Sequence, residues 1–201
     1  MLKYIIIFLC FTGIAFSQNQ KCELLFKDGT TIEGYASLTK KNRIKFRLDK
    51  KSNADIWGSE NIQRITFFGF ENSQLAFEYV KTRWKRTYEL MEVVVDGDIK
   101  LYARADTSWI HFPLNVNIGE GSVFQPNNGN ISRQTSFTLF LKKIEDEKAI
   151  LVKIGLFSSW KKKMIAYFNN CPEVTEGIAS GEYKYRDMKK LVEDYNIYCA
   201  K

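Results

Sequence analysis

Histidine is almost absent from this chain, which has a single one, His111, among 201 residues. One imidazole excludes metal sites built from several histidines and leaves one candidate for histidine-based acid–base catalysis. Proline is also scarce, with 3 residues, whereas hydrophobic residues make up 45% of the chain and aromatic residues 14%. This composition excludes collagen-like, low-complexity and disordered chains and is typical of one globular unit.

Long hydrophobic runs are also missing, apart from one at the N-terminus that is too short to predict a membrane span. Residues 1–17 read MLKYIIIFLCFTGIAFS, with one early cation, an apolar centre and a small-residue end. The pattern is typical of a secretory signal peptide, so we expect cleavage between Ser17 and Gln18 and no membrane span in the mature chain. The expected location is the periplasm or the cell exterior. An uncleaved anchor helix and a lipoprotein signal at Cys10 are the alternatives.

Cysteine is rare as well, with 4 residues and no C-x-x-C motif. Loss of the leader would leave Cys22, Cys171 and Cys199 in a compartment that permits disulfides. We expect a bridge between Cys171 and Cys199, which would tie the last helix to the one before it and contribute on the order of 3 kcal/mol. Cys22 would then be unpaired. The alternative is three free buried thiols, and no neighbouring histidine supports a nucleophilic role.

Polar and apolar residues alternate from Cys22 to about Phe157, which predicts strands with one buried face. Asp96-Gly97 predicts a hairpin turn, and the apolar strand before it is expected to be central. The predicted strands cover 31–38, 43–48, 61–68, 74–80, 88–95, 99–102, 109–112, 136–142 and 149–156.

After Phe157 the apolar spacing becomes helical. Ser158-Ser159 predicts the start of a first helix, a second covers 173–180 and stops at Gly181, and a third covers 186–198. The third should bury Met188, Leu191, Val192 and Tyr195. We therefore expect an α+β fold: an antiparallel, barrel-like or sandwich β-rich body over 18–157, then a C-terminal cap of two to three helices over 158–201, packed as one globular unit.

Three stretches carry a resemblance to other proteins: ELMEVVVDGDIKLY at 89–102, FSSWKKKMIAYFNNCP at 157–172 and DMKKLV at 187–192. They resemble uncharacterised small secreted proteins of flavobacteria and related bacteria, a group with no assigned activity. The resemblance spans most of the mature chain and implies export, but it adds no chemistry.

No motif assigns a catalytic residue, a cofactor or a metal, because nucleophile elbow, phosphate-binding loop and metal-ligand spacings are all missing. His111 stands between aromatic residues on a predicted strand, where a buried structural role is expected. Glu89 and Glu92, in an apolar strand, are the first carboxylate pair to test, and solvated or ion-paired roles are the expected alternative for both. The long loop 113–130, rich in asparagine and glycine, would flank an active site if one exists.

Positive charge gathers in three short segments, 40–51, 81–86 and 160–163. Aromatic residues among cations are typical of contacts with anionic sugars or phosphates, and the alternative is a solvated surface. The residues that we expect to bind are Lys81, Arg83, Trp84, Lys85, Arg86, Trp160 and Lys161.

These patterns favour an exported, non-enzymatic module, in the cell envelope or secreted, that binds an anionic surface or glycan. The expected partners are anionic lipid, lipopolysaccharide, acidic polysaccharide or another envelope protein, whereas nucleic acid is not expected outside the cell. The alternatives are a hydrolase with a site near loop 113–130 and a structural subunit of a larger envelope assembly.

Overall fold

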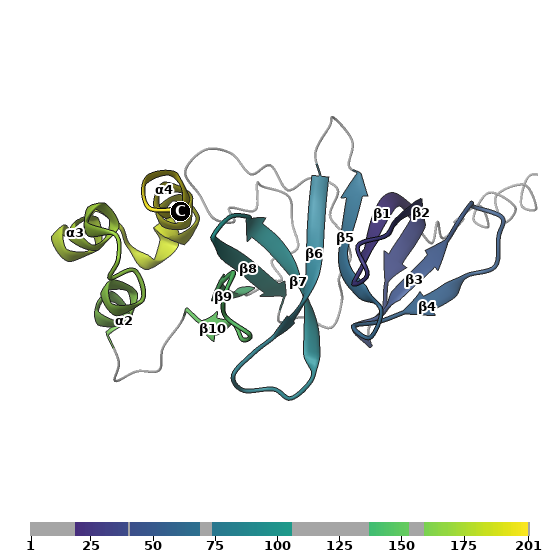
Figure 1. Cartoon of the computed structure of the whole chain (residues 1–201), viewed down its shortest axis with the longest axis horizontal. Helices are drawn as coiled ribbons and strands as arrows, with labels where there is room; N and C mark the ends of the chain where they lie inside the picture. Colours follow the sequence, from purple (N-terminus) through teal and green to yellow (C-terminus); the bar gives the residue numbers. More distant parts are fainter. Residues whose placement is uncertain (1–18, 40, 69–73, 106–136, 153–158, 201) are drawn as a thin grey trace, which may run out of the picture.

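The computed structural model describes residues 19–39, 41–68, 74–105, 137–152 and 159–200. Within them, ten strands form one antiparallel sheet and three α-helices follow the last strand, which confirms the predicted α+β class (Figure 1). The strands are β1 (Gln20–Phe26), β2 (Thr31–Leu38), β3 (Ile44–Arg47), β4 (Asp55–Trp57), β5 (Ile62–Phe68), β6 (Gln74–Lys81), β7 (Tyr88–Val95), β8 (Ile99–Ala105), β9 (Phe137–Lys143) and β10 (Ile150–Leu151). The helices are α2 (Trp160–Tyr167), α3 (Pro172–Ser180) and α4 (Met188–Tyr198). No helix in these ranges is long and apolar enough to cross a membrane.

The sheet follows the order β10-β9-β8-β7-β6-β5-β1-β2-β3-β4. Most neighbours are consecutive in the chain because short turns join antiparallel strands. Gly29 and Gly97, at two of these turns, have positive φ angles of 87° and 156°. The exception is β5, which returns to pair with β1. The sequence alone did not distinguish a barrel from a sandwich. In the described part of the chain, hydrogen bonds join the ten strands into one sheet whose edge strands are β4 and β10.

The alternation of polar and apolar residues in the sequence predicted the positions of most strands. The predicted runs 31–38 and 88–95 coincide with β2 and β7, and β7 is central, between β6 and β8. Strands β1 and β4 were not assigned from the sequence. Of the predicted strand 149–156, β10 covers Ile150–Leu151, and the residues from 153 onward lie outside the described ranges. The predicted strand 109–112 also lies outside them.

One face of the sheet builds two hydrophobic cores. Leu24, Ile65 and Phe77 are cross-strand neighbours on β1, β5 and β6 and belong to the first core. Leu101 on β8 and Leu141 on β9 lie on the same face of the sheet. The three helices pack against this part of the face and form the second core with it. Figure 1 accordingly shows the helices at one end of the molecule and β3 and β4 at the opposite end.

The helices begin and end where local chemistry predicts. Ser159 caps α2 by accepting a hydrogen bond from the backbone N–H of Lys162, and Gly181 ends α3 with a φ of 90°. A short 3₁₀ turn at Tyr185–Asp187 leads into α4. The apolar face predicted for the last helix is confirmed, because α4 buries Met188, Leu191, Val192 and Tyr195.

Two contacts hold α4 in place. The side-chain amide of Asn196 accepts from the backbone N–H of Ile99 at 3.0 Å and donates to its carbonyl at 2.9 Å, as a paired strand would. A Cβ atom on Gly97 would lie 2.4 Å from Asn196 Nδ2, so this approach needs glycine. At its end, α4 is joined to the start of α3 by the predicted disulfide between Cys171 and Cys199, with a Cα–Cα distance of 5.7 Å.

Candidate functional site

The predicted binding segment 81–86 begins at the end of β6 and forms most of the β6–β7 hairpin loop, seen at the bottom of Figure 1. Lys81 and Tyr88 are the last residues that pair across the hairpin. Thr82 is buried and forms a parallel bridge with Ala149, whose N–H donates to the Lys81 carbonyl at 2.8 Å. The hairpin tip, which we define as residues 82–87, is therefore anchored to the segment that leads into β10.

Beyond Thr82 the hairpin tip is exposed to solvent. Trp84 is the extreme case, with 80% of its surface exposed. An indole combines a large apolar surface with one N–H donor, so its favoured environment is a boundary between apolar and aqueous phases. Trp84 has no such environment within the described residues, which makes the tip a candidate contact surface.

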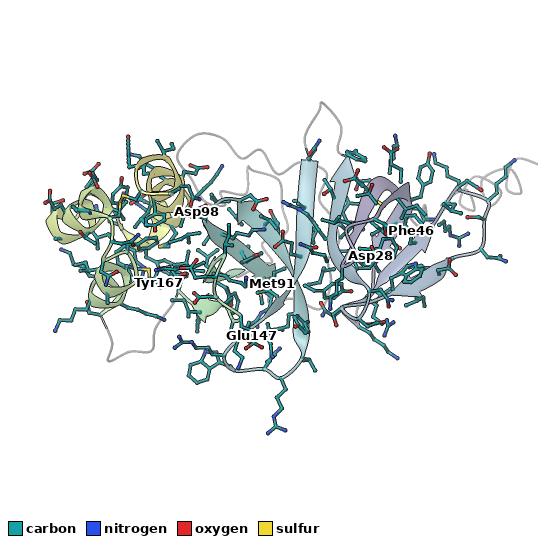
Figure 2. All side chains as sticks on the ribbon, in the orientation of Figure 1. Asp28, Phe46, Met91, Asp98, Glu147 and Tyr167 are labelled. Carbon is teal, nitrogen blue, oxygen red and sulfur yellow. A yellow bond between two sulfur atoms is a disulfide. The ribbon has the colours of Figure 1, made fainter. Side chains whose placement is uncertain are left out.

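Two of the four cations in this segment form ion pairs with carboxylates. Lys81 forms an ion pair with Glu147 of the β9–β10 turn, which is labelled in Figure 2, and this hydrogen-bonded pair raises the pKa of Lys81. Lys85 Nζ lies 2.6 Å from a carboxylate oxygen of Glu89. Within the described ranges, the exposed side chains of Arg83 and Arg86 form no ion pair or hydrogen bond. Among the described residues, the two arginines are thus the cations of the tip that have no carboxylate partner.

The other predicted binding residues, Trp160 and Lys161, open α2 and contact the protein itself. Trp160 is half-buried and packs against the core formed with the helices. The Lys161 ammonium donates to the carbonyl of Ala179 in α3. The structure therefore gives both residues contacts in the packing of α2, and Lys161 keeps an exposed charge with a backbone partner.

Lys163, which was not among the predicted binding residues, lies beside the hairpin tip. Its ammonium donates to the backbone carbonyl of Leu151 in β10. Partial burial lowers the pKa of Lys163, and the charge of the Arg83 guanidinium lowers it further. The segment 160–163 and the hairpin tip, treated as separate basic segments in the sequence, are thus neighbours in space.

A groove of about 350 Å³ opens at the base of the same hairpin. Glu78, 9% exposed, lies in its lining and accepts hydrogen bonds from Lys100 Nζ at 2.8 Å and the Tyr102 hydroxyl at 2.7 Å. Arg64 lies 3.6 Å from the same carboxylate. Burial, and then the charge of Glu78, raises the pKa of Tyr102, so this hydroxyl remains a protonated donor. The Glu78 charge is fully compensated, and the network ties β5, β6 and β8 together.

The carboxylate pair chosen for testing does not converge. Glu89 pairs across the sheet with Val80 and Glu92 with Phe77, so the two carboxylates leave β7 on opposite faces. Glu89 accepts from Lys85 and lies 3.1 Å from Arg104, whereas burial raises the pKa of Glu92. Two carboxylates on opposite faces cannot act on one glycosidic bond.

The hydrolase alternative depends on residues outside the described ranges. These residues are His111 and loop 113–130. The predicted signal-cleavage residues, Ser17 and Gln18, also lie outside the described ranges. Cys22, the unbridged cysteine, is described and buried, and burial raises its pKa to about 12. Cys22 is therefore held as a thiol, which is a poor nucleophile.

Among the described residues, one group of potential metal ligands comes together, Cys171, Cys199 and Glu173. Its two sulfur atoms are joined in the disulfide and so cannot act as thiolate ligands.

The surface formed by the hairpin tip and the first turn of α2 is the better candidate site. Compared with protein-family models, curated proteins and solved structures, the chain has no significant match.

Proposed function

We propose that this protein is an exported, non-enzymatic module of the cell envelope that binds an anionic lipid surface through the β6–β7 hairpin tip. The observation that carries the proposal is Trp84, which is 80% exposed between Arg83 and Arg86, two exposed arginines. Tryptophan is enriched at membrane–water interfaces, and each arginine near an anionic membrane contributes about 1 kcal/mol to binding.

Export is supported by the disulfide and by the leader-like pattern. Disulfides form and persist in oxidising compartments, and Cys171 and Cys199 are bridged. Residues 1–17 have the composition of a signal peptide. The resemblance to secreted flavobacterial proteins belongs to the same proposal.

Anionic lipid is favoured over acidic polysaccharide because of the tryptophan. Both ligands supply negative charge for Arg83 and Arg86, but a lipid layer also places a continuous apolar phase directly beneath its charged surface, which suits an exposed indole flanked by arginines. A Trp84→Ala variant should therefore lose affinity for lipid vesicles. If the variant binds vesicles as well as the wild type does, the indole does not enter the lipid layer and the lipid assignment is wrong. Unchanged vesicle binding together with a loss of acidic-polysaccharide binding would assign the ligand as a glycan.

The direct test is co-sedimentation of the mature protein with vesicles of phosphatidylglycerol in phosphatidylcholine. Replacing both arginines, Arg83→Ala with Arg86→Ala, should weaken binding by about 2 kcal/mol, which is roughly thirtyfold. The matched control is Lys50→Ala with Lys51→Ala, which removes the same charge from the exposed β3–β4 turn at the far end of the sheet (Figure 1). Equal losses in the two double variants, or no loss in the first, would contradict the proposal.

A further inference from the structure

We propose that Arg83 and Lys163 together form a phosphomonoester subsite within this surface. The protein would then prefer anionic lipids that end in a phosphate monoester, such as phosphatidic acid, over lipids that carry only a phosphodiester. The inference rests on the proposed function and adds the class of headgroup that the surface selects.

The backbone brings these two cations together. The bridge between Thr82 and Ala149 is parallel, so the chain from Thr82 to Arg83 and the chain from Ala149 to Leu151 leave it in the same direction. The Leu151 carbonyl at the end of that path accepts a hydrogen bond from Lys163 Nζ. The pKa of Lys163 is lowered by burial and then by the Arg83 charge, as this backbone path leads us to expect. Strand pairing and one side-chain hydrogen bond thus bring the backbone next to Arg83 and the Lys163 ammonium to the same short segment, 149–151.

The donors of this pair suit a phosphate group. An ammonium has three N–H donors, and the Leu151 carbonyl engages one on Lys163, so others remain for a ligand. The guanidinium of Arg83 is exposed, and its planar fork can contact two phosphate oxygens at once. Lys163 also lies in the first turn of α2, where the helix dipole favours negative charge.

The charge of the ligand decides the selectivity. A phosphomonoester carries between about 1.5 and 2 negative charges near neutral pH and three terminal oxygens, whereas a phosphodiester carries one charge. Two cations held together repel each other, and a dianion that contacts both relieves that repulsion more than a monoanion does. Lys85 is paired with Glu89 and Lys161 with the carbonyl of Ala179 in α3, so Arg83 and Lys163 are the two cations that the Thr82–Ala149 bridge and the Leu151 carbonyl bring to this end of β10.

The test compares vesicles that contain phosphatidic acid with vesicles that contain phosphatidylglycerol, adjusted to the same surface potential. At matched potential the wild-type protein should bind phosphatidic acid about fivefold more tightly. Lys163→Gln removes the ammonium but keeps an amide donor for the Leu151 carbonyl, and should abolish the preference. Lys162→Gln, which removes an exposed lysine of the same helical turn, is the matched control and should retain it. Unfolding temperatures of both variants show whether they remain folded.

Each result has a distinct meaning. Equal binding of the wild type to the two lipids overturns the subsite and leaves the proposed function standing, whereas binding to neither overturns both. Equal loss of preference in Lys163→Gln and Lys162→Gln also overturns the subsite, because general charge would then explain the selectivity. Inorganic phosphate is the last arm: saturable binding of free phosphate that depends on Lys163, without any lipid preference, would assign the pair to soluble phosphate and refute the lipid headgroup.

Discussion

Opening the bridge between Cys171 and Cys199 should lower the free energy of unfolding by about 3.5 kcal/mol. The two residues are 28 positions apart, and closing a loop of that length removes about 12 cal/mol/K of entropy from the unfolded chain. The bridge joins the N-cap of α3 to the C-cap of α4, so it constrains two helices that already pack on the sheet. The whole effect should therefore come from the unfolded state.

The assay is urea unfolding followed by circular dichroism, on the wild type with and without reductant and on Cys171→Ala with Cys199→Ala. The reduced wild type is the matched control, since its side chains are unchanged and only the cross-link is lost. Cys171 is fully buried, so the double variant should lose somewhat more stability than the reduced chain because it also leaves a cavity. A loss below about 1 kcal/mol on reduction would refute the loop-entropy argument.

Asn196→Ala should destabilise the protein by about 3 kcal/mol, because it leaves the buried N–H and carbonyl of Ile99 without partners, and chemical unfolding measures this loss. A change within about 0.5 kcal/mol would show that water replaces the amide. Glu92→Gln should stabilise the protein by about 1 kcal/mol at neutral pH, because burial raises the pKa of Glu92 in the folded state. A raised folded pKa means that stability falls as pH rises from the ordinary glutamate value through the folded value, so the gain should vanish in acid; unfolding temperatures measured against pH check this, and a gain that is the same at every pH would contradict it.

The site was only partly predictable from the sequence. The exposed hairpin tip with Trp84 follows from an aromatic residue among cations between two strands. Which cations remain uncompensated does not follow, because the partner of Lys81 is on the β9–β10 turn, far away in the chain. The groove network around Glu78 was also missed, since its members are single residues on β5, β6 and β8 with no spacing in common.

The sequence by itself determined the local structure. Alternation of residues defined β2 and β7, Ser159 and Gly181 bounded helices, and the turn at Asp96-Gly97 joined two strands, because each depends on interactions within a few residues. The Cys171–Cys199 bridge was also predicted, but its two residues are 28 positions apart and three free thiols remained the alternative until the structure brought the two cysteines together.

Only the tertiary structure decided which segments meet. The return of β5 to β1 and the three-residue strand β4 depend on which sheet edge is free, and no local pattern encodes that. The same holds for Arg83 and Lys163, which become neighbours because Thr82 bridges to Ala149 and Lys163 reaches the β10 backbone. Their meeting is a long-range consequence of packing, and it turns two separate basic segments into one surface.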